Sequence, residues 1–247
     1  MKNSIFKATL RFYMDEFARF FDKEIPWSDF WKNELEKYEK TIEKAMEYID
    51  EKKIWKGSEK QKPRLKSIFS EISLNRVNAK ELHHGIVKLD LSEKIFPGEE
   101  SEEDLFSQFL DEFKKIDENV NPHTVYYLLK KYAFFIPYSN DVSLFTHMKL
   151  TSAVASCIEK IDEKPFLFVY GDFSGIQKFI YDVASPDEAR RGMAKRLRGR
   201  SLWLVLFMDA VVSEIIRRAG VSEANVLWRT GGNFLLLLPN CKENRDI

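Results

Sequence analysis

The C-terminal third of the chain alternates short apolar runs with one long amphipathic stretch. The apolar run from Phe166 to Tyr170 has the composition of a β-strand and ends at Gly171 and Asp172. Apolar residues at helical spacing then follow at Leu197, Leu202, Val205, Met208, Val212, Ile215 and Ala219. Two further runs, 226–229 and 234–238, flank the paired glycines of residues 230–233, which is a strong hairpin signal. The order strand, helix, strand, strand predicts the opening of a ferredoxin-like fold.

Helical patterns dominate the first 62 residues. One broad apolar face is formed by Ile5, Phe6, Leu10, Tyr13, Phe17, Phe20 and Phe21. After a break at Pro26, Ser28 is a good N-cap for a second helix. The apolar positions of that helix are Trp31, Leu35, Tyr38, Ile42, Ala45 and Ile49. A charged linker, residues 52–62, ends the region.

Residues 63–164 have the pattern of a mixed connector. Gly85 to Leu91 alternates as a strand does, and Pro97-Gly98 indicates a turn. Three helices are expected next: one after the acidic residues 99–104, one beginning near Asn121-Pro122, and one over about Leu144 to Ile161. We therefore predict an α+β fold with a helical region (1–62), a mixed connector (63–164) and a partial βαββ domain (165–247).

Composition narrows the class of protein. The 247 residues are 44% apolar, which is ample for a core, and carry no net charge. A balanced charge argues against a uniformly basic nucleic-acid coat and leaves only local patches to consider. The two cysteines have no metal-ligand spacing, and no run of some 20 apolar residues predicts a membrane span. A cytoplasmic protein without a membrane partner is the default expectation.

Three motifs in the C-terminal third are specific in combination. They are GDFSGIQKFI at residues 171–180, LRGRS at 197–201, and GGNF at 231–234 with its apolar run into Pro239. In this order and spacing they resemble the first Palm domain of the large subunit of type III-A (Csm-type) CRISPR effector complexes. Residues 63–70, 141–147 and 151–155 resemble segments of the same family that precede this domain, so the resemblance covers roughly residues 63–239. It implies that residues 1–62 are the last helices of the family's HD domain and that the Palm is incomplete at its C-terminus.

The family's two activities depend on motifs outside this match. Its single-stranded DNA nuclease needs a His-Asp pair at a metal site, and none of the four histidines here is followed by Asp. Its nucleotidyltransferase makes cyclic oligoadenylates from ATP with Mg²⁺, and the family carries the GGDD carboxylates for this step in the second Palm. The hairpin here offers Asn233 where a catalytic palm presents acidic residues, and an amide is a poor ligand for a hard cation. We expect no catalytic and no metal-ligating residues in this chain, which alone would be inactive.

Two glycine-rich loops are candidates for nucleotide binding. The candidate residues are Gly171, Asp172, Ser174 and Gly175 after the first strand, and Gly231, Gly232 and Asn233 in the hairpin. Glycine permits a close backbone approach to a phosphate or base, and the resemblance places both loops beside ATP that lies between two Palms. The alternatives are a tight strand-to-helix turn and an ordinary hairpin turn, and the sequence leaves them open.

A cluster of six cations within eleven residues is the second candidate site; its members are Arg190, Arg191, Lys195, Arg196, Arg198 and Arg200. At the start of a long helix they oppose the positive end of the helix dipole, so an anionic partner would stabilise them. Guide RNA, target RNA and ATP phosphates are the functional options. The alternative is a solvated face, or salt bridges to Asp187 and Glu188.

The histidines do not predict a metal site. Adjacent side chains on a strand point to opposite faces, so His83 and His84 are poor joint ligands, and His147 has the position of a satisfied helical residue. Three functions stay open: half of an ATP site completed by a separately encoded second Palm, a scaffold for RNA or for other Csm-type subunits, and an inactive truncated fragment.

Overall fold

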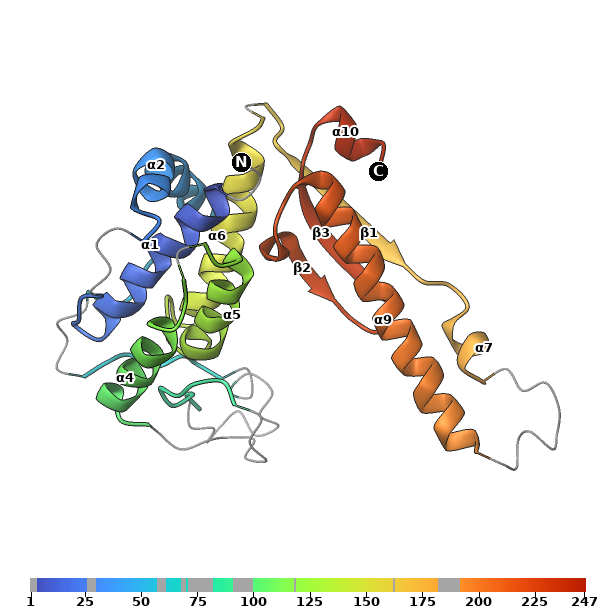
Figure 1. Ribbon diagram of the computed structural model, residues 1–247, viewed down its shortest axis with the longest axis horizontal. Coiled ribbons are helices and arrows are strands. Elements are labelled where there is room, and N and C mark those ends of the chain that lie inside the picture. Colours follow the sequence, from blue (N-terminus) through green and yellow to red (C-terminus); the bar gives the residue numbers. More distant parts are fainter. Residues whose placement is uncertain are drawn as a thin grey trace. The chain divides into compact units, whose positions relative to one another are not determined.

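The computed structural model describes residues 4–25, 30–56, 61–67, 70, 82–90, 100–117, 119–161, 163–181 and 192–247. They form two compact units, which divide between Ala155 and Ser156 (Figure 1). The first unit is helical and the second holds a small antiparallel sheet, so the predicted α+β class is confirmed. The predicted domain boundaries at 62/63 and 164/165 stay predictions.

Helix α1 (Ser4–Phe20) is the central helix of the first unit. All seven apolar positions predicted for this segment are buried, from Ile5 at 7% exposed to Phe17 and Phe20 at 0%. Aromatic rings of α1 contact two other helices: Phe17 lies 4.5 Å from Phe109 of α4 (Glu102–Phe113), and Phe6 lies 5.8 Å from Tyr126 of α5 (Pro122–Ala133). The amphipathic pattern therefore correctly predicted a core helix.

Helix α2 (Lys32–Ile49) begins later than the sequence predicted. Trp31 precedes the helix in the left-handed region, with φ 53°, although its side chain is buried as expected. Of the other predicted apolar positions, Tyr38, Ile42 and Ala45 are buried. Ser28, the expected N-cap, lies outside the described residues.

The connector region contains the predicted helices but not the predicted strand. Ser101 caps α4, and Asn121 caps α5 by accepting a hydrogen bond from the His123 amide at 3.1 Å. Helix α6 (Leu144–Ile158) ends three residues before the predicted Ile161. Gly85–Asp90 forms no strand: the neighbours Ile86 and Val87 are both buried, whereas a strand with one buried face would expose one of them. Leu91 and the predicted turn at Pro97-Gly98 lie outside the described residues.

The second unit follows the predicted order of strand, helix, strand, strand. Strand β1 (Phe166–Asp172) pairs antiparallel with β3 (Asn233–Pro239), which also pairs antiparallel with β2 (Val226–Arg229). The sheet order is β1-β3-β2. Short helices α7 (Ile176–Tyr181), η1 (Glu223–Asn225) and α10 (Lys242–Arg245) complete the unit. The hairpin is confirmed, and β1 has one open edge among the described residues.

The long helix α9 (Met193–Ala219) covers one face of this sheet (Figure 1). Its buried positions are Leu204, Met208, Val212, Ile216 and Ala219, and the last four of these pack with Val226, Phe234, Leu236 and Leu238. The predicted contact face was therefore partly wrong, because Leu202 is 59% and Val205 is 45% exposed. Within the described part of the chain, no helix combines the length and apolar character needed to cross a membrane.

A buried amide joins η1 to the sheet, and its removal gives a first prediction. The Asn225 side chain is 0% exposed, and its Nδ2 donates to Ser156 Oγ at 2.9 Å and to the Leu237 carbonyl at 2.7 Å. Asn225→Ala leaves that buried carbonyl without this donor, so we expect a loss of about 2 kcal/mol in the free energy of unfolding. Urea denaturation of the full chain, with hydrogen exchange of β3 amides, measures the loss. Asn119→Ala, at an exposed site, is the matched control; a loss below about 0.5 kcal/mol for Asn225→Ala would contradict the prediction.

Candidate functional site

The two glycine-rich loops meet at one end of the sheet. Asp172, the last residue of β1, lies opposite Asn233, the first residue of β3. The Phe173 amide donates a hydrogen bond of 2.8 Å to the Gly232 carbonyl. The strand-end loop (residues 171–175) and the hairpin turn (residues 230–233) are thus neighbours, and the structure brings together the seven residues predicted for nucleotide binding.

Packing and backbone geometry explain three of the four glycines in these loops. A Cβ at Gly171 would overlap the Phe234 ring. Even Cε2 of that ring would lie only 3.0 Å from the added Cβ, and two other ring atoms would lie closer. A Cβ at Gly232 would collide with the Ile176 side chain, and Gly175 has φ 77°, in the left-handed region that favours glycine. Gly231 has open space around it. The glycines therefore allow the loops to form, whether or not a ligand approaches them.

The polar groups of the two loops differ in their accessibility. Asp172, Ser174 and the backbone of Gly175 and Gly231 are exposed. The Asn233 Oδ1 accepts a hydrogen bond from Thr230 Oγ1 at 2.8 Å, which stabilises the turn. The described residues contain no group of three or more His, Cys, Asp or Glu side chains that could hold a metal ion. The loops therefore offer a carboxylate, a hydroxyl and exposed backbone, a set suited to hydrogen bonding.

The predicted cation cluster lies apart from the glycine loops. Phe173, in the strand-end loop, contacts Phe207 of α9 with ring centroids 5.0 Å apart. Arg200 lies seven residues before Phe207, about 10 Å away along the helix axis, and the other described cations lie farther still. Lys195 and Arg198 are exposed on the first turns of α9. Arg190 and Arg191, also predicted for this cluster, lie outside the described residues.

Arg200 has a local structural role. Its Nη1 donates to the Phe179 carbonyl at 2.9 Å and to the Ile180 carbonyl at 3.1 Å, near the end of α7. The guanidinium also lies over the Phe179 ring, 5.7 Å from its centroid. Carbonyls at a helix end carry partial negative charge, so this arginine stabilises α7 against α9. The glycine loops and the cations are therefore two separate candidate sites.

The sequence analysis missed an aromatic ladder that links the loop to α9. Trp203 stacks on Phe207 with centroids 5.0 Å apart and an interplanar angle of 8°, and Phe179 lies 5.3 Å from Trp203. The signal was available, because residues four apart on a helix are neighbours on its surface.

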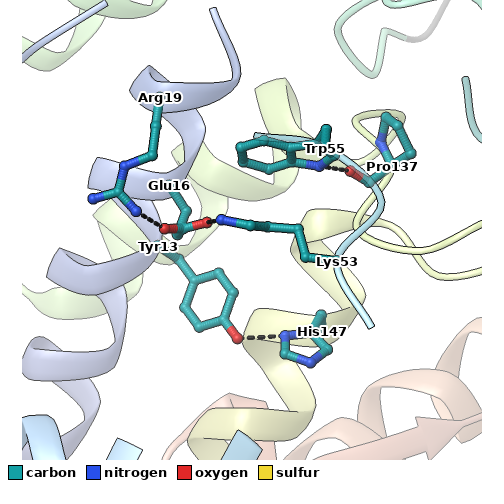
Figure 2. Close-up of polar contacts among 7 residues, drawn as sticks. All are labelled: Tyr13, Glu16, Arg19, Lys53, Trp55, Pro137 and His147. Atoms are coloured by element: carbon teal, nitrogen blue, oxygen red, sulfur yellow. Dashed lines mark hydrogen bonds and ion pairs between the residues drawn. The ribbon is translucent and has the colours of Figure 1, made fainter. Parts of the chain in front are cut away.

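Buried polar groups in the first unit are structural rather than catalytic (Figure 2). The hydroxyl of Tyr13 and Nδ1 of His147 share a hydrogen bond between α1 and α6, and Thr151 Oγ1 lies 2.8 Å from the same hydroxyl. The Tyr138 ring stacks on the His147 imidazole at 3.6 Å. Burial lowers the pKa of His147 to about 3 and raises the pKa of Tyr13. The imidazole is thus neutral at ordinary pH. The prediction of a satisfied residue holds for Nδ1 but is wrong for the buried Nε2, which has no hydrogen-bond partner among the described residues.

A second buried group in the same figure fixes the segment after α2. The Glu16 carboxylate is paired with Arg19 and with Lys53 Nζ, the latter at 2.7 Å. Lys53 also lies over the Trp55 ring, and the Trp55 indole donates to the Pro137 carbonyl at 2.6 Å. A buried carboxylate is stable only when paired, so these contacts hold residues 53–55 against α1.

Comparison with known proteins supports the predicted likeness. Residues 165–247 match the family model described as Csm1 subunit domain B. The chain is 38% identical over 130 residues to the subtype III-A single-strand-specific deoxyribonuclease Cas10/Csm1 of Thermococcus onnurineus, covering 46% of this chain and 16% of that protein. It is 27% identical over 240 residues to the protein of the same description from Methanocaldococcus jannaschii, covering 76% of this chain and 29% of that protein.

Solved structures give the same result at the level of the fold. A crystal structure of Csm1 from T. onnurineus has a TM-score of 0.62 and 28% identity, covering 83% of this chain and 29% of that one. A Csm1–Csm4 subcomplex of the type III-A interference complex has a TM-score of 0.64 and 26% identity. This match covers 86% of this chain and 29% of that one. The chain thus corresponds to a portion of a Csm-type large subunit, as its motifs predicted. It spans between 16% and 29% of the length of these curated relatives.

Proposed function

We propose that residues 165–247 act as the first Palm domain of a type III-A CRISPR large subunit, and that their glycine loops form one wall of an ATP site. The observation that carries this proposal is the hydrogen bond from Phe173 to Gly232, which joins both loops within the part that matches Csm1 domain B. A related Csm1–Csm4 cassette, 26% identical to this chain, was crystallised with AMPPNP. The nucleotide would serve the synthesis of cyclic oligoadenylates by the complete protein.

The role proposed for this Palm is binding and not catalysis. Phosphoryl transfer with two metal ions needs carboxylates that hold the cations roughly 4 Å apart. Asp172 is the one carboxylate that the two loops present, and Asn233 lies opposite it. The catalytic carboxylates and most of the Mg²⁺ coordination would therefore come from a second Palm, which is the partner that this site requires.

Photolabelling tests the proposal, and Ser174→Ala is its sharpest variant. The exposed hydroxyl of Ser174 can donate a hydrogen bond to a phosphate, so its removal should weaken binding of 8-azido-ATP by about three- to tenfold. The chain is labelled in the presence of Mg²⁺, and the modified residues are mapped by mass spectrometry. We expect labels within residues 171–181 or 226–234.

Ser107→Ala, at an exposed position of α4 in the other unit, is the matched control and should label as the unmodified chain does. Saturable labelling confined to other segments, or unchanged labelling of Ser174→Ala, would show that the glycine loops are not the nucleotide site.

A second candidate function is a scaffold for other Csm-type subunits and for guide or target RNA. Two observations favour it: similar proteins were solved as Csm1–Csm4 subcomplexes, and Lys195 and Arg198 are exposed at the start of α9. Exposed cations of this kind bind phosphates with an affinity that falls steeply as salt rises. Both candidate functions can hold together, because the cations lie apart from the glycine loops.

A further inference from the structure

The sheet of the second unit has two apolar faces, and α9 lies on one of them (Figure 1). Side chains alternate between the faces along a strand, and directly paired residues share a face. On the side of α9 are Leu167, Val169, Val226, Phe234, Leu236 and Leu238. The positions in between belong to the opposite side, and those nearest the glycine loops are Phe168, Tyr170 and Asp172 of β1, Trp228 of β2, and Asn233, Leu235 and Leu237 of β3. We call this side the aromatic face.

Three rings of the aromatic face are exposed to solvent. Phe168 is 62%, Tyr170 is 59% and Trp228 is 49% exposed. Tyr170 and Trp228 both pair with Leu235, so their rings flank this leucine in one row across the sheet. Two strand spacings of about 4.8 Å separate their backbones, which gives about 10 Å. A flat ligand over Leu235 would thus lie about 5 Å from each ring, within the roughly 4.5–7 Å of stacked and edge contacts.

The aromatic face ends at the candidate nucleotide loops. Asp172 follows Tyr170 by two residues on β1, which is about 7 Å along the strand, and Asn233 precedes Leu235 by two residues on β3. A spacing of two residues keeps Asp172 and Asn233 on the same side of the sheet as the rings. A ligand whose polar end meets the loops can therefore lay a flat ring on the row of Tyr170, Leu235 and Trp228.

The chemistry of the aromatic face favours a single nucleotide over a nucleic-acid strand. Its strand positions include one acid, Asp172, and no Lys or Arg. A single strand bound by stacking also needs a positive groove that follows its backbone. A mononucleotide has no such need, because its phosphates would lie beyond the last row of the face, at the loops. The exposed groups are flat rings, which are the side chains on which bases stack.

We propose that the aromatic face holds the base of the nucleotide, stacked between Tyr170 and Trp228 over Leu235, while the glycine loops meet its phosphates. This inference rests on the proposed function and adds the part of the site that takes the base. Every base has a π-face, so stacking accepts nucleotides as a class. The row therefore does not select adenine, and ATP and GTP should bind to the full chain with affinities within about threefold of each other.

Two substitutions of Tyr170 separate stacking from simple apolar contact. Tyr170→Leu keeps an apolar side chain but removes the flat ring, so the affinity of the full chain for ATP with Mg²⁺, measured by equilibrium dialysis, should fall about five- to a hundredfold. Tyr170→Phe keeps the ring and should bind ATP as the unmodified chain does. Tyr48→Leu, at a tyrosine of α2 that is 52% exposed, is the matched control and should also bind normally. Equal loss of affinity in Tyr170→Leu and Tyr170→Phe would overturn the stacking.

Inorganic triphosphate, which has no base, separates this inference from the proposed function. Its binding, measured by calorimetry, should be weakened by Ser174→Ala and unchanged by Tyr170→Leu. If Ser174→Ala weakens ATP binding and Tyr170→Leu does not, the loops bind the nucleotide and the stacking is wrong. If Tyr170→Leu weakens ATP binding and Ser174→Ala does not, the aromatic face stands and the loops are not the phosphate site. If neither variant weakens ATP binding, both proposals are wrong.

Two other occupants of the aromatic face are outcomes of the same experiments. A fluorescent polyadenylate strand is titrated against the unmodified chain and Tyr170→Leu. If the strand binds, Tyr170→Leu weakens it and ATP does not bind, the face is a site for single-stranded RNA. If ATP does not bind and the chain sediments as a dimer that Phe168→Glu dissociates, the face is an interface between two copies. Either result would overturn the proposal.

Discussion

Gly171→Val should lower the free energy of unfolding of the second unit by about 3 kcal/mol. The Phe234 ring lies directly over Gly171, is 6% exposed and packs in the core with Met208 and Val212. A planar ring in a filled core cannot move aside without shifting its neighbours, so the added methyl groups force a strained arrangement. Urea denaturation of the full chain, with hydrogen exchange read separately for β1 and β3, measures the loss.

Two other glycines of the same loops serve as graded controls. Gly231→Val adds the same side chain where a Cβ meets nothing within 4 Å, so its effect should stay within about 0.5 kcal/mol. Gly232→Ala meets the flexible end of Ile176, which can rotate away, so its effect should be intermediate. If Gly171→Val and Gly231→Val unfold at the same urea concentration, the Phe234 contact does not explain the glycine.

The same contact changes how the glycine-rich motif is interpreted. From sequence, Gly171 indicated either a close approach to a nucleotide or a tight turn, and these could not be separated. The structure supplies a third reason, because β3 brings Phe234 over the strand end. A motif glycine within a predicted loop can thus be required by a residue that lies 63 positions away in the chain. Evidence for nucleotide binding must come from the exposed groups, Ser174 above all.

Local patterns were sufficient to predict the elements of the second unit. The paired glycines fixed the hairpin, and the apolar runs placed β2 at Val226–Arg229, where the structure has it. The contact face of α9 was harder to predict. A helix that is apolar on most sides gives a broad pattern, and only the position of the sheet decides that Leu204 is buried and Leu202 exposed.

Contacts between distant segments had no signal in the sequence. Val87, Leu89 and Leu91 alternate with polar residues as a strand would, yet tertiary packing buries the consecutive residues Ile86 and Val87 together. Tyr13 and His147 are separated by 134 residues, and neither pattern nor composition pairs them. Sequence reasoning placed His147 on a helix and favoured a structural role, but the partner that gives it this role emerged only from the fold.

His147 should make the first unit unstable in mild acid. Its pKa is lowered to about 3 in the folded chain by burial, against about 6.5 when unfolded. Well above pH 6.5 the imidazole is neutral in both states, so it contributes no pH dependence there. Between pH 6.5 and 3 the unfolded chain binds a proton that the folded chain does not. The free energy of unfolding therefore decreases as the pH is lowered, by roughly 2 kcal/mol from pH 6.5 to pH 5.

The pH slope, rather than the stability at one pH, distinguishes this cause from other acid effects. His147→Asn keeps a polar group beside the Tyr13 hydroxyl but removes the titration, so unfolding of the first unit should lose most of its dependence on pH between 6.5 and 5 (Figure 2). His83→Asn, at an exposed site in the same unit, should retain the slope of the unmodified chain. Carboxylates titrate mainly below this range, which is why the comparison stops at pH 5. An unaltered slope in His147→Asn would mean that the buried imidazole is not the group that senses acid, and that its hydrogen bond to Tyr13 survives protonation.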